Sequence, residues 1–386
     1  MKIVADANIP LLTEAFGPVA EVDARPAHAI TPETVADADA LLVRSVTRVD
    51  AALLDASRVR FVATATIGVD HVDTAYLAHR NIGFASAQGS NARSVAEYVL
   101  SALCVLGERN GRGLLDLTVG VVGVGNVGGR LAGMLDALGV ELLRNDPPLA
   151  RQTGDPRYVP LNALADADVV TFHVPLTRTG RDATYHMAGA GLIEQLKAGV
   201  WLLNTSRGAV ADTEALAAAA DAGRLGAIVC DVWENEPDID ARLLERADLG
   251  TPHVAGYSYD GKASGTRMVL EALCEHFGIE RAWDPAPLMP PPVVSRVDLP
   301  AGIGVEEALG RAVRAAYDIE QDDRRLRAML RRPAKGRPAY FTSLRQDYPV
   351  RREFPETTVA LAEADTAVAD ALRAVGFPVE TSAGQA

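Results

Sequence analysis

Short apolar runs alternate with amphipathic stretches along most of the chain. The apolar runs have the composition of buried parallel strands and lie at residues 2–5, 19–22, 40–43, 60–64, 119–122, 140–143, 169–172, 200–203, 227–230 and 357–361. Between them, apolar residues recur at helical intervals at residues 9–16, 49–54, 94–106, 131–138, 265–277, 305–330 and 366–375. Strands that alternate with helices build parallel sheets with helices on their faces, so the pattern predicts an α/β protein.

One strand-to-helix transition carries the sequence TVGVVGVGNVGGR at residues 118–130. Gly123, Gly125 and Gly128 have the spacing G-x-G-x-x-G, which permits a tight turn, a close approach to a pyrophosphate, and close packing of helix on strand. Asp146 follows the next strand, at the position of the acid that binds the ribose hydroxyls of NAD. A carboxylate there repels the 2′-phosphate of NADP, so the sequence predicts an NAD site. The alternative is a glycine turn without a ligand and a solvated loop aspartate.

Three further motifs follow successive strands of the same pattern: NTSRG at 204–208, DVWENEP at 231–237 and TPHVAGY at 251–257. They place Arg207, Glu236 and His253 at carboxyl ends of strands, where open α/β sheets bind ligands. An arginine grips a substrate carboxylate, a histidine takes a hydroxyl proton, and a carboxylate orients the imidazole. These residue types predict hydride transfer from a 2-hydroxy acid. Taken singly, they could be a surface cation, a turn residue and a loop histidine.

Charge and composition limit the classes of partner. The formal net charge of -13 argues against a general nucleic-acid or membrane-surface role, and an anionic substrate would need local positive charge. Cys104, Cys230 and Cys274 are far apart, so neither a disulfide framework nor a metal site is expected. Asp6 interrupts the start of the chain where a signal peptide needs an apolar core, and no run is long enough to span a membrane. We therefore expect a cytoplasmic protein.

The length and the prolines predict the domain organisation. At 386 residues the chain is long for one core, so two or three domains are expected. The sequence WDPAPLMPPP at 283–292 interrupts helix and strand and marks a boundary. We expect a substrate-binding domain of residues 1–92 and 258–285, an NAD-binding domain of residues 93–257, and a small C-terminal α/β domain of residues 286–386.

The motifs together carry a family resemblance. GVGNVG at 123–128 with Asp146, then FHVPLT, NTSRG, DVWENEP and TPH, resemble the D-isomer-specific 2-hydroxyacid dehydrogenases over about residues 1–280. The resemblance implies two doubly wound parallel-sheet domains, a flavodoxin-like substrate domain and a Rossmann NAD domain. It also implies that Arg207, Glu236 and His253 are the catalytic residues.

A narrower resemblance within that family rests on KIVADANIP, RSVTRVD, TATIGVDHVD, NDPP and HVAGYSYDGKASGT. It implies a small anionic phosphorylated 2-hydroxy acid as substrate and a homodimer formed through the C-terminal domain. The expected substrate contacts are Ser45, Thr66 and Tyr257, to which Arg44 is added because a guanidinium suits a phosphate, with Arg93 and Lys262 as further candidates. The expected NAD contacts are Gly123, Gly125, Asn126, Val127, Gly128, Asp146, Val174, Ser206, Asp231 and Gly256.

Two other functions fit the same motifs. One is a dehydrogenase with the same chemistry on 3-phosphoglycerate, a shorter acid. The other is a non-enzymatic NAD-sensing binding protein that keeps the fold and the three residues. The acidic net charge and the substrate-side motifs argue against the second.

Overall fold

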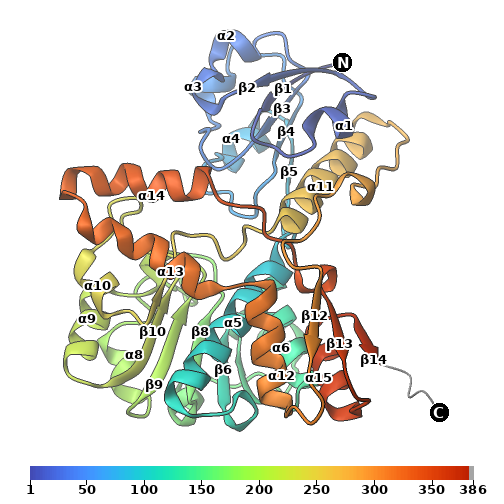
Figure 1. Ribbon diagram of the computed structural model, residues 1–386. Coiled ribbons are helices and arrows are strands. Elements are labelled where there is room, and N and C mark those ends of the chain that lie inside the picture. The colour runs from blue at the N-terminus through green and yellow to red at the C-terminus, as the bar shows by residue number, and fades with distance from the viewer. Residues whose placement is uncertain (382–386) are drawn as a thin grey trace. The chain divides into compact units, whose positions relative to one another are not determined.

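The computed structural model describes residues 1–381 and divides into two compact units. The first unit comprises Met1–Asn91 and Ser258–Pro290, and the second comprises Ala92–Tyr257 and the chain from Pro291 onward. Every strand pair in the three sheets is parallel, and helices connect the strands (Figure 1). The prediction of an α/β protein with doubly wound parallel sheets is confirmed.

The first unit is built on a five-stranded sheet of order β2-β1-β3-β4-β5. Its strands are β1 (Lys2–Asp6), β2 (Glu21–Arg25), β3 (Ala40–Val43), β4 (Phe61–Thr64) and β5 (Gly83–Ser86). Its helices are α1 (Leu12–Phe16), α2 (Pro32–Val35), α3 (Ala51–Leu54), α4 (Thr74–His79) and α11 (Tyr259–Phe277). Neighbouring residues of one strand enter different cores, as Ile3 and Val4 do, because successive side chains point to opposite faces. Both faces are therefore covered by helices.

The second unit contains a six-stranded sheet of order β11-β10-β9-β8-β6-β7. Its strands are β6 (Thr118–Val122), β7 (Glu141–Asn145), β8 (Val169–Phe172), β9 (Val200–Asn204), β10 (Leu225–Cys230) and β11 (Leu249–Gly250). Its helices are α5 (Ala92–Asn110), α6 (Asn126–Ala137), α7 (Pro147–Thr153), α8 (Ala190–Gln195), α9 (Thr213–Asp221) and α10 (Ala241–Arg246). The strand order reverses between β6 and β8, which is where a doubly wound sheet binds its ligand.

The C-terminal region, from Pro291 onward, packs into the same compact unit. It forms a three-stranded parallel sheet of β12 (Arg296–Leu299), β13 (Thr358–Leu361) and β14 (Val379–Thr381). Its helices are α12 (Val305–Ala316), α13 (Ile319–Arg327), α14 (Arg337–Gln346) and α15 (Thr366–Val375). Helix α12 packs against α5, and α15 against α6 (Figure 1). The division of this unit into two domains stays a prediction.

Short 3-10 helices complete the described chain at Ala27–Ala29, Leu114–Asp116, Leu161–Asp166, Gly208–Val210, Ala286–Leu288, Ala328–Arg331, Ala334–Gly336 and Phe354–Glu356. The helical region predicted over about 305–330 contains the two helices α12 and α13, and Asp318 caps α13 by accepting the Gln321 N–H. Within residues 1–381, no helix has the length and apolar character needed to cross a membrane. No group of three or more candidate ligands in that range could hold a metal ion.

Candidate active site

The glycine turn lies between β6 and α6. Gly123 has φ +84°, a conformation that side chains with a Cβ rarely adopt. A Cβ on Gly128 would collide with the carbonyl oxygen of Gly123, so α6 can approach the turn this closely only because residue 128 is glycine. Val174, at the end of β8, lies against the same turn, since a Cβ on Gly123 would sit 2.7 Å from its Cγ1.

Gly125 is the residue of this turn at which a dinucleotide could approach the backbone. It caps α6, and a Cβ built on it would meet nothing within 4 Å. The N-terminus of a helix as long as α6 offers free N–H groups and a positive dipole end. Asn126 and Val127 begin the helix just behind this open space. The open space at Gly125 and the N-terminus of α6 are thus features that suit the pyrophosphate of NAD.

Asp146 connects this turn to the next strand and helix. One carboxylate oxygen accepts the N–H of Val124 at 2.9 Å, and the other caps α7 by accepting the N–H of Leu149 at 3.0 Å. Each oxygen keeps a second lone pair for another donor. The carboxylate thus lies beside the glycine turn, where a ribose would follow a pyrophosphate.

Arg207, Glu236 and His253 follow three neighbouring strands, β9, β10 and β11. The segment after β9 packs directly on the segment after β10, because Gly208 contacts the backbone of Trp233 so closely that no side chain would fit. Asn204 shapes the first of these segments by donating to the Arg207 carbonyl at 3.0 Å. The strand order and this contact bring the three predicted residues to one edge of one sheet.

His253 and Glu236 form a direct pair, with 2.7 Å between imidazole Nδ1 and carboxylate Oε2. Burial raises the pKa of Glu236, but the charge and hydrogen bond of His253, together with the Trp233 N–H, outweigh it and hold that pKa below its ordinary value. Glu236 is therefore a carboxylate, and a carboxylate only accepts, so Nδ1 carries the proton of this bond. Nε2 is left as the basic nitrogen of a side chain that is 34% exposed.

His253 belongs to a segment that we call the catalytic loop, residues 251–257. Its φ of +58° is strained for a residue with a Cβ and persists only where neighbours fix the backbone. The Asp231 carbonyl accepts the His253 N–H at 2.7 Å. The Asp231 carboxylate accepts the Thr251 hydroxyl at 2.6 Å and the N–H groups of Val254 and Ala255 at 2.7 and 3.1 Å. Asp231 therefore holds the loop, and its expected contact with NAD stays a prediction.

Ser206 and His173 line the neighbouring strand ends. Ser206 is buried, and its hydroxyl donates to Asn204 at 2.8 Å. His173 lies between the hydroxyls of Thr171 and Thr205, at 3.0 and 3.1 Å. Burial lowers the pKa of His173 to about 3, so this imidazole is neutral and is not available as a base at neutral pH.

The expected substrate contacts of the first unit follow β3 and β4. Arg44 and Ser45 come directly after β3, and the Arg44 guanidinium donates to the Asn8 carbonyl at 3.1 Å. Thr66 follows β4, and its hydroxyl donates to the Gly68 carbonyl at 3.1 Å. Lys262 lies in the first turn of α11, where burial and the charge of Arg44 lower its pKa to about 8. Two cations thus lie near each other beside two hydroxyl-bearing strand ends.

Known proteins resemble this chain over its whole length. A family model described as the NAD binding domain of D-isomer specific 2-hydroxyacid dehydrogenases matches residues 98–255. The erythronate-4-phosphate dehydrogenase of Marinobacter nauticus is 46% identical over 385 residues, which cover 98% of this chain and 100% of the relative. That of Salinibacter ruber is 48% identical over 389 residues, with 97% and 98% covered. The chain belongs to the erythronate-4-phosphate dehydrogenase family.

The NAD-bound 3-phosphoglycerate dehydrogenase of Entamoeba histolytica matches with a TM-score of 0.61 and 23% identity, over 72% of this chain and 95% of that one. This likeness concerns the fold alone. A family model described only as a domain of unknown function matches residues 288–376, within the C-terminal region. The matched family model is an NAD binding domain, and the cofactor of this chain is NAD, as the glycine turn predicted.

The structure also adds residues that the motifs did not reveal. The cation of Arg345, at the end of α14, lies 5.6 Å from the ring centroid of Tyr257, and its charge contributes to the low pKa of Glu236. His186 pairs with Glu234 at 2.8 Å, so His253 is not the only histidine with a carboxylate partner among the described residues. Arg93, a candidate for the substrate, instead lies 3.7 Å from Glu97.

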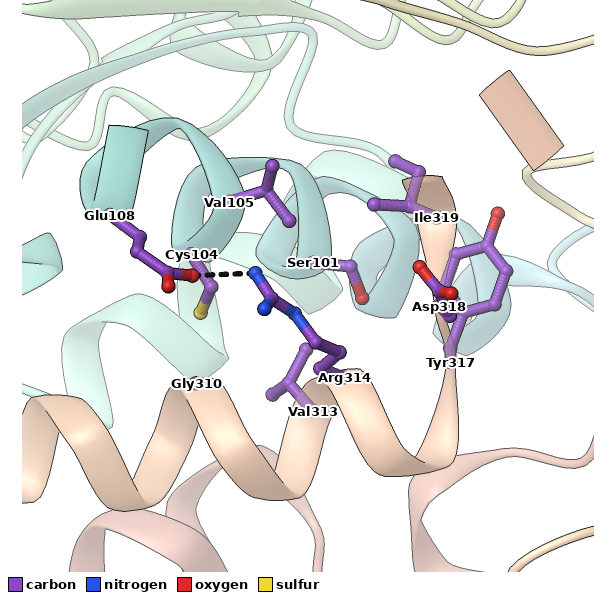
Figure 2. A pocket seen from close by; sticks show the side chains of 10 residues that line it. All are labelled: Ser101, Cys104, Val105, Glu108, Gly310, Val313, Arg314, Tyr317, Asp318 and Ile319. Carbon is purple, nitrogen blue, oxygen red and sulfur yellow. Dashed lines mark hydrogen bonds and ion pairs between the residues drawn. The ribbon is translucent and has the colours of Figure 1, made fainter. Parts of the chain in front are cut away.

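A small pocket lies between α5 and α12, and Arg207, Glu236 and His253 are not among the residues that line it (Figure 2). Glu108 and Arg314 form an ion pair across it at 2.5 Å, and Cys104 lies in its wall. Burial raises the pKa of Cys104 to about 12, so its thiol is not nucleophilic at neutral pH. We assign no chemistry to this pocket.

Proposed function

We propose that this chain catalyses the NAD-dependent oxidation of 4-phospho-D-erythronate to 3-hydroxy-2-oxo-4-phosphooxybutanoate, an early step towards pyridoxal 5′-phosphate. The pair of His253 and Glu236, at the strand end next to the Arg207 segment, carries the proposal. The names of the two bacterial relatives support the choice of substrate.

Each residue of the trio has one task in this reaction. NAD, when bound, accepts the hydrogen of C2 with its electron pair. His253 takes the proton of the C2 hydroxyl on Nε2, so that the remaining electron pair forms the carbonyl. Glu236 stabilises the resulting imidazolium through Nδ1, and Arg207 binds the substrate carboxylate and polarises the new carbonyl oxygen.

The phosphoryl group is the feature that separates this substrate from simpler 2-hydroxy acids. We assign its recognition to Arg44 and Lys262, with the hydroxyls of Ser45 and Thr66, and we assign Tyr257 to the rest of the acid. Two neighbouring cations repel each other, and a doubly charged anion relieves that repulsion. Local positive charge of this kind is what an anionic substrate needs in a chain with a net charge of -13.

Replacing Lys262 with methionine tests this assignment. Lys262 is protonated below its pKa of about 8, so kcat/KM for the phosphorylated acid should fall as the pH rises through that value. In Lys262→Met that decline should disappear, and KM should rise roughly tenfold, as loss of a charge-assisted bond predicts. The exposed Lys335, changed to methionine, is the matched control. An unaltered KM and pH profile in Lys262→Met would remove this residue from the site.

Asp146 should decide the choice between NAD and NADP. In Asp146→Asn the amide oxygen can still cap α7, but the charge that repels a 2′-phosphate is gone. We expect the Kd for NAD to rise about tenfold and the preference over NADP to fall, because a charge-assisted hydrogen bond is lost. Titration calorimetry with both dinucleotides measures this. An unchanged ratio of the two affinities would refute the ribose role of Asp146.

A side-by-side turnover assay tests the substrate. Purified protein with NAD is offered 4-phospho-D-erythronate, 3-phosphoglycerate and unphosphorylated D-erythronate. The proposal expects the highest kcat/KM on the first. Preference for 3-phosphoglycerate would favour the alternative enzyme, and NAD binding without turnover of any acid would favour a sensor. The homodimer expected through residues 286–386 and the cytoplasmic location stay predictions.

A further inference from the structure

The C-terminal region contributes one buried side chain to the support of the catalytic loop. Arg351 lies between α14 and the 3-10 helix Phe354–Glu356, and only 6% of its surface is exposed. Its guanidinium donates to the carbonyl of Ala255 at 3.1 Å and to the carbonyl of Ser94, in α5, at 2.8 Å. Ala255 is in the loop that carries His253, so one side chain bridges that loop and α5.

A buried arginine stays charged and is costly unless its surroundings replace water. Here the two carbonyl oxygens accept hydrogen bonds, and the face of the Tyr317 ring lies 3.7 Å from the guanidinium carbon. The carboxyl groups of Glu97 and Asp322 also favour the cation, while its Nε is buried without a hydrogen-bond partner. The two bonds to backbone carbonyls therefore fix the orientation of the guanidinium.

The backbone around Arg351 is itself anchored to α5. The Phe354 N–H donates to the buried carboxyl of Glu97 at 3.0 Å, and the Ser94 hydroxyl donates to Glu353 at 2.9 Å. These contacts leave the segment little freedom to move with the loop. The guanidinium of Arg351 is therefore held in place relative to α5, so it can position the backbone of the catalytic loop.

The catalytic loop is held on both sides of His253. Before it, the Tyr98 hydroxyl of α5 bonds to the Thr251 hydroxyl at 2.7 Å. After it, both backbone polar groups of Ala255 are bound: the Asp231 carboxylate accepts the Ala255 N–H, and Arg351 donates to the Ala255 carbonyl. The strained φ of His253 lies between these attachments. Removing one of them lets the backbone relax and the imidazole turn away from Glu236.

We propose that Arg351 is a positioning residue of the active site, through which the C-terminal region fixes the loop that carries the catalytic histidine. This inference rests on the proposed function for its kinetic consequence, but its structural consequence is independent of the substrate. On this account the C-terminal region is a part of the catalytic unit.

The test compares three variants of the full chain. Arg351→Ala removes both hydrogen bonds, and Arg351→Lys keeps a cation that reaches one carbonyl at a time. Arg337→Met is the matched control: Arg337 also comes from the C-terminal region and donates to the Leu330 and Arg332 carbonyls of that region, at 3.3 and 3.2 Å. All three lose bonds from an arginine to backbone carbonyls, and two of them affect the catalytic loop.

Hydrogen exchange of NAD-free protein, read on peptides that cover residues 251–257, is the first measurement. We expect exchange there to rise about tenfold in Arg351→Ala and less in Arg351→Lys, because local opening becomes easier. In Arg337→Met it should not change. Hydrogen exchange does not depend on any substrate, so it tests the positioning role of Arg351 by itself. If the chain were inactive on 4-phospho-D-erythronate, only the proposed function would be overturned.

Kinetics are the second measurement. Arg351→Ala should lose about 10²-fold in kcat, as misplacement of a catalytic group by about 1 Å does, while the Kd for NAD stays unchanged. Added guanidinium ion should restore part of kcat in this variant and leave the kcat of Arg337→Met unchanged. If Arg351→Ala does not fold, Arg351→Lys decides. A folded Arg351→Lys protein with unchanged exchange at residues 251–257 and unchanged kcat would overturn the proposal.

Discussion

Replacing His253 with alanine should reduce kcat by ~10²–10⁴ and leave NAD binding intact. The reduction follows from the geometry, because Nε2 is the basic nitrogen once Nδ1 is bonded to Glu236. NAD binding should persist because we assign the dinucleotide to the glycine turn at Gly123–Gly128, and His253 belongs to a different segment, after β11. Steady-state turnover and calorimetric titration with NAD measure the two effects separately.

Three controls make the result specific to the base. His253→Asn keeps a residue that tolerates the positive φ, so its loss of kcat cannot be attributed to the backbone. The double variant of His253→Ala with Glu236→Gln should be no slower than the first change alone, because the pair acts as a unit. His79→Ala changes an exposed histidine at the end of α4 and should have full activity. Normal turnover in His253→Asn would show that another group takes the proton.

Replacing Arg207 with methionine should lower kcat/KM by ~10²–10³, because the variant loses both the bond to the substrate carboxylate and the polarisation of the carbonyl. Arg207→Lys should recover only part, since an ammonium cannot form the bidentate pair. The Kd for NAD should not change in either variant. Turnover as a function of substrate concentration separates the effect on KM from that on kcat.

Arg246→Met provides the comparison for this change. Arg246 belongs to the same unit and forms an ion pair with Asp221 at 2.6 Å, at the surface. Its loss should leave kcat/KM unchanged. If Arg207→Met and Arg246→Met behaved alike, Arg207 would be a surface cation after a strand, which is the reading that the sequence alone left open.

The strands that were easiest to predict are those buried on both faces. Residues 40–43 are uniformly apolar and residues 169–172 are apolar except for Thr171, and the observed strands Ala40–Val43 and Val169–Phe172 have the predicted bounds. The strand expected at 19–22 lies instead at Glu21–Arg25, where charged residues alternate along the edge of the sheet. Strand β5 was missed because GFAS has no apolar run and is a strand only through its pairing with β4.

The grouping of Arg207, Glu236 and His253 could be predicted from the sequence because the carboxyl ends of parallel strands lie at one edge of their sheet. Motifs that follow neighbouring strands therefore come together at that edge. Arg345 and Arg351 could not, because they reach the catalytic loop from a segment without a motif. Their places depend on how the C-terminal region packs on α5, and side-chain packing over such sequence separations leaves no local pattern.

Substrate carrying deuterium at C2 distinguishes direct transfer of the C2 hydrogen to NAD from its release to solvent. We expect mass spectrometry of the NADH formed in a single turnover to show the deuterium in NADH. In His253→Asn the same label should appear in NADH, but more slowly, because only the acceptor of the hydroxyl proton is lost. Recovery of the deuterium in water would rule out hydride transfer from C2 to NAD with His253 as the base.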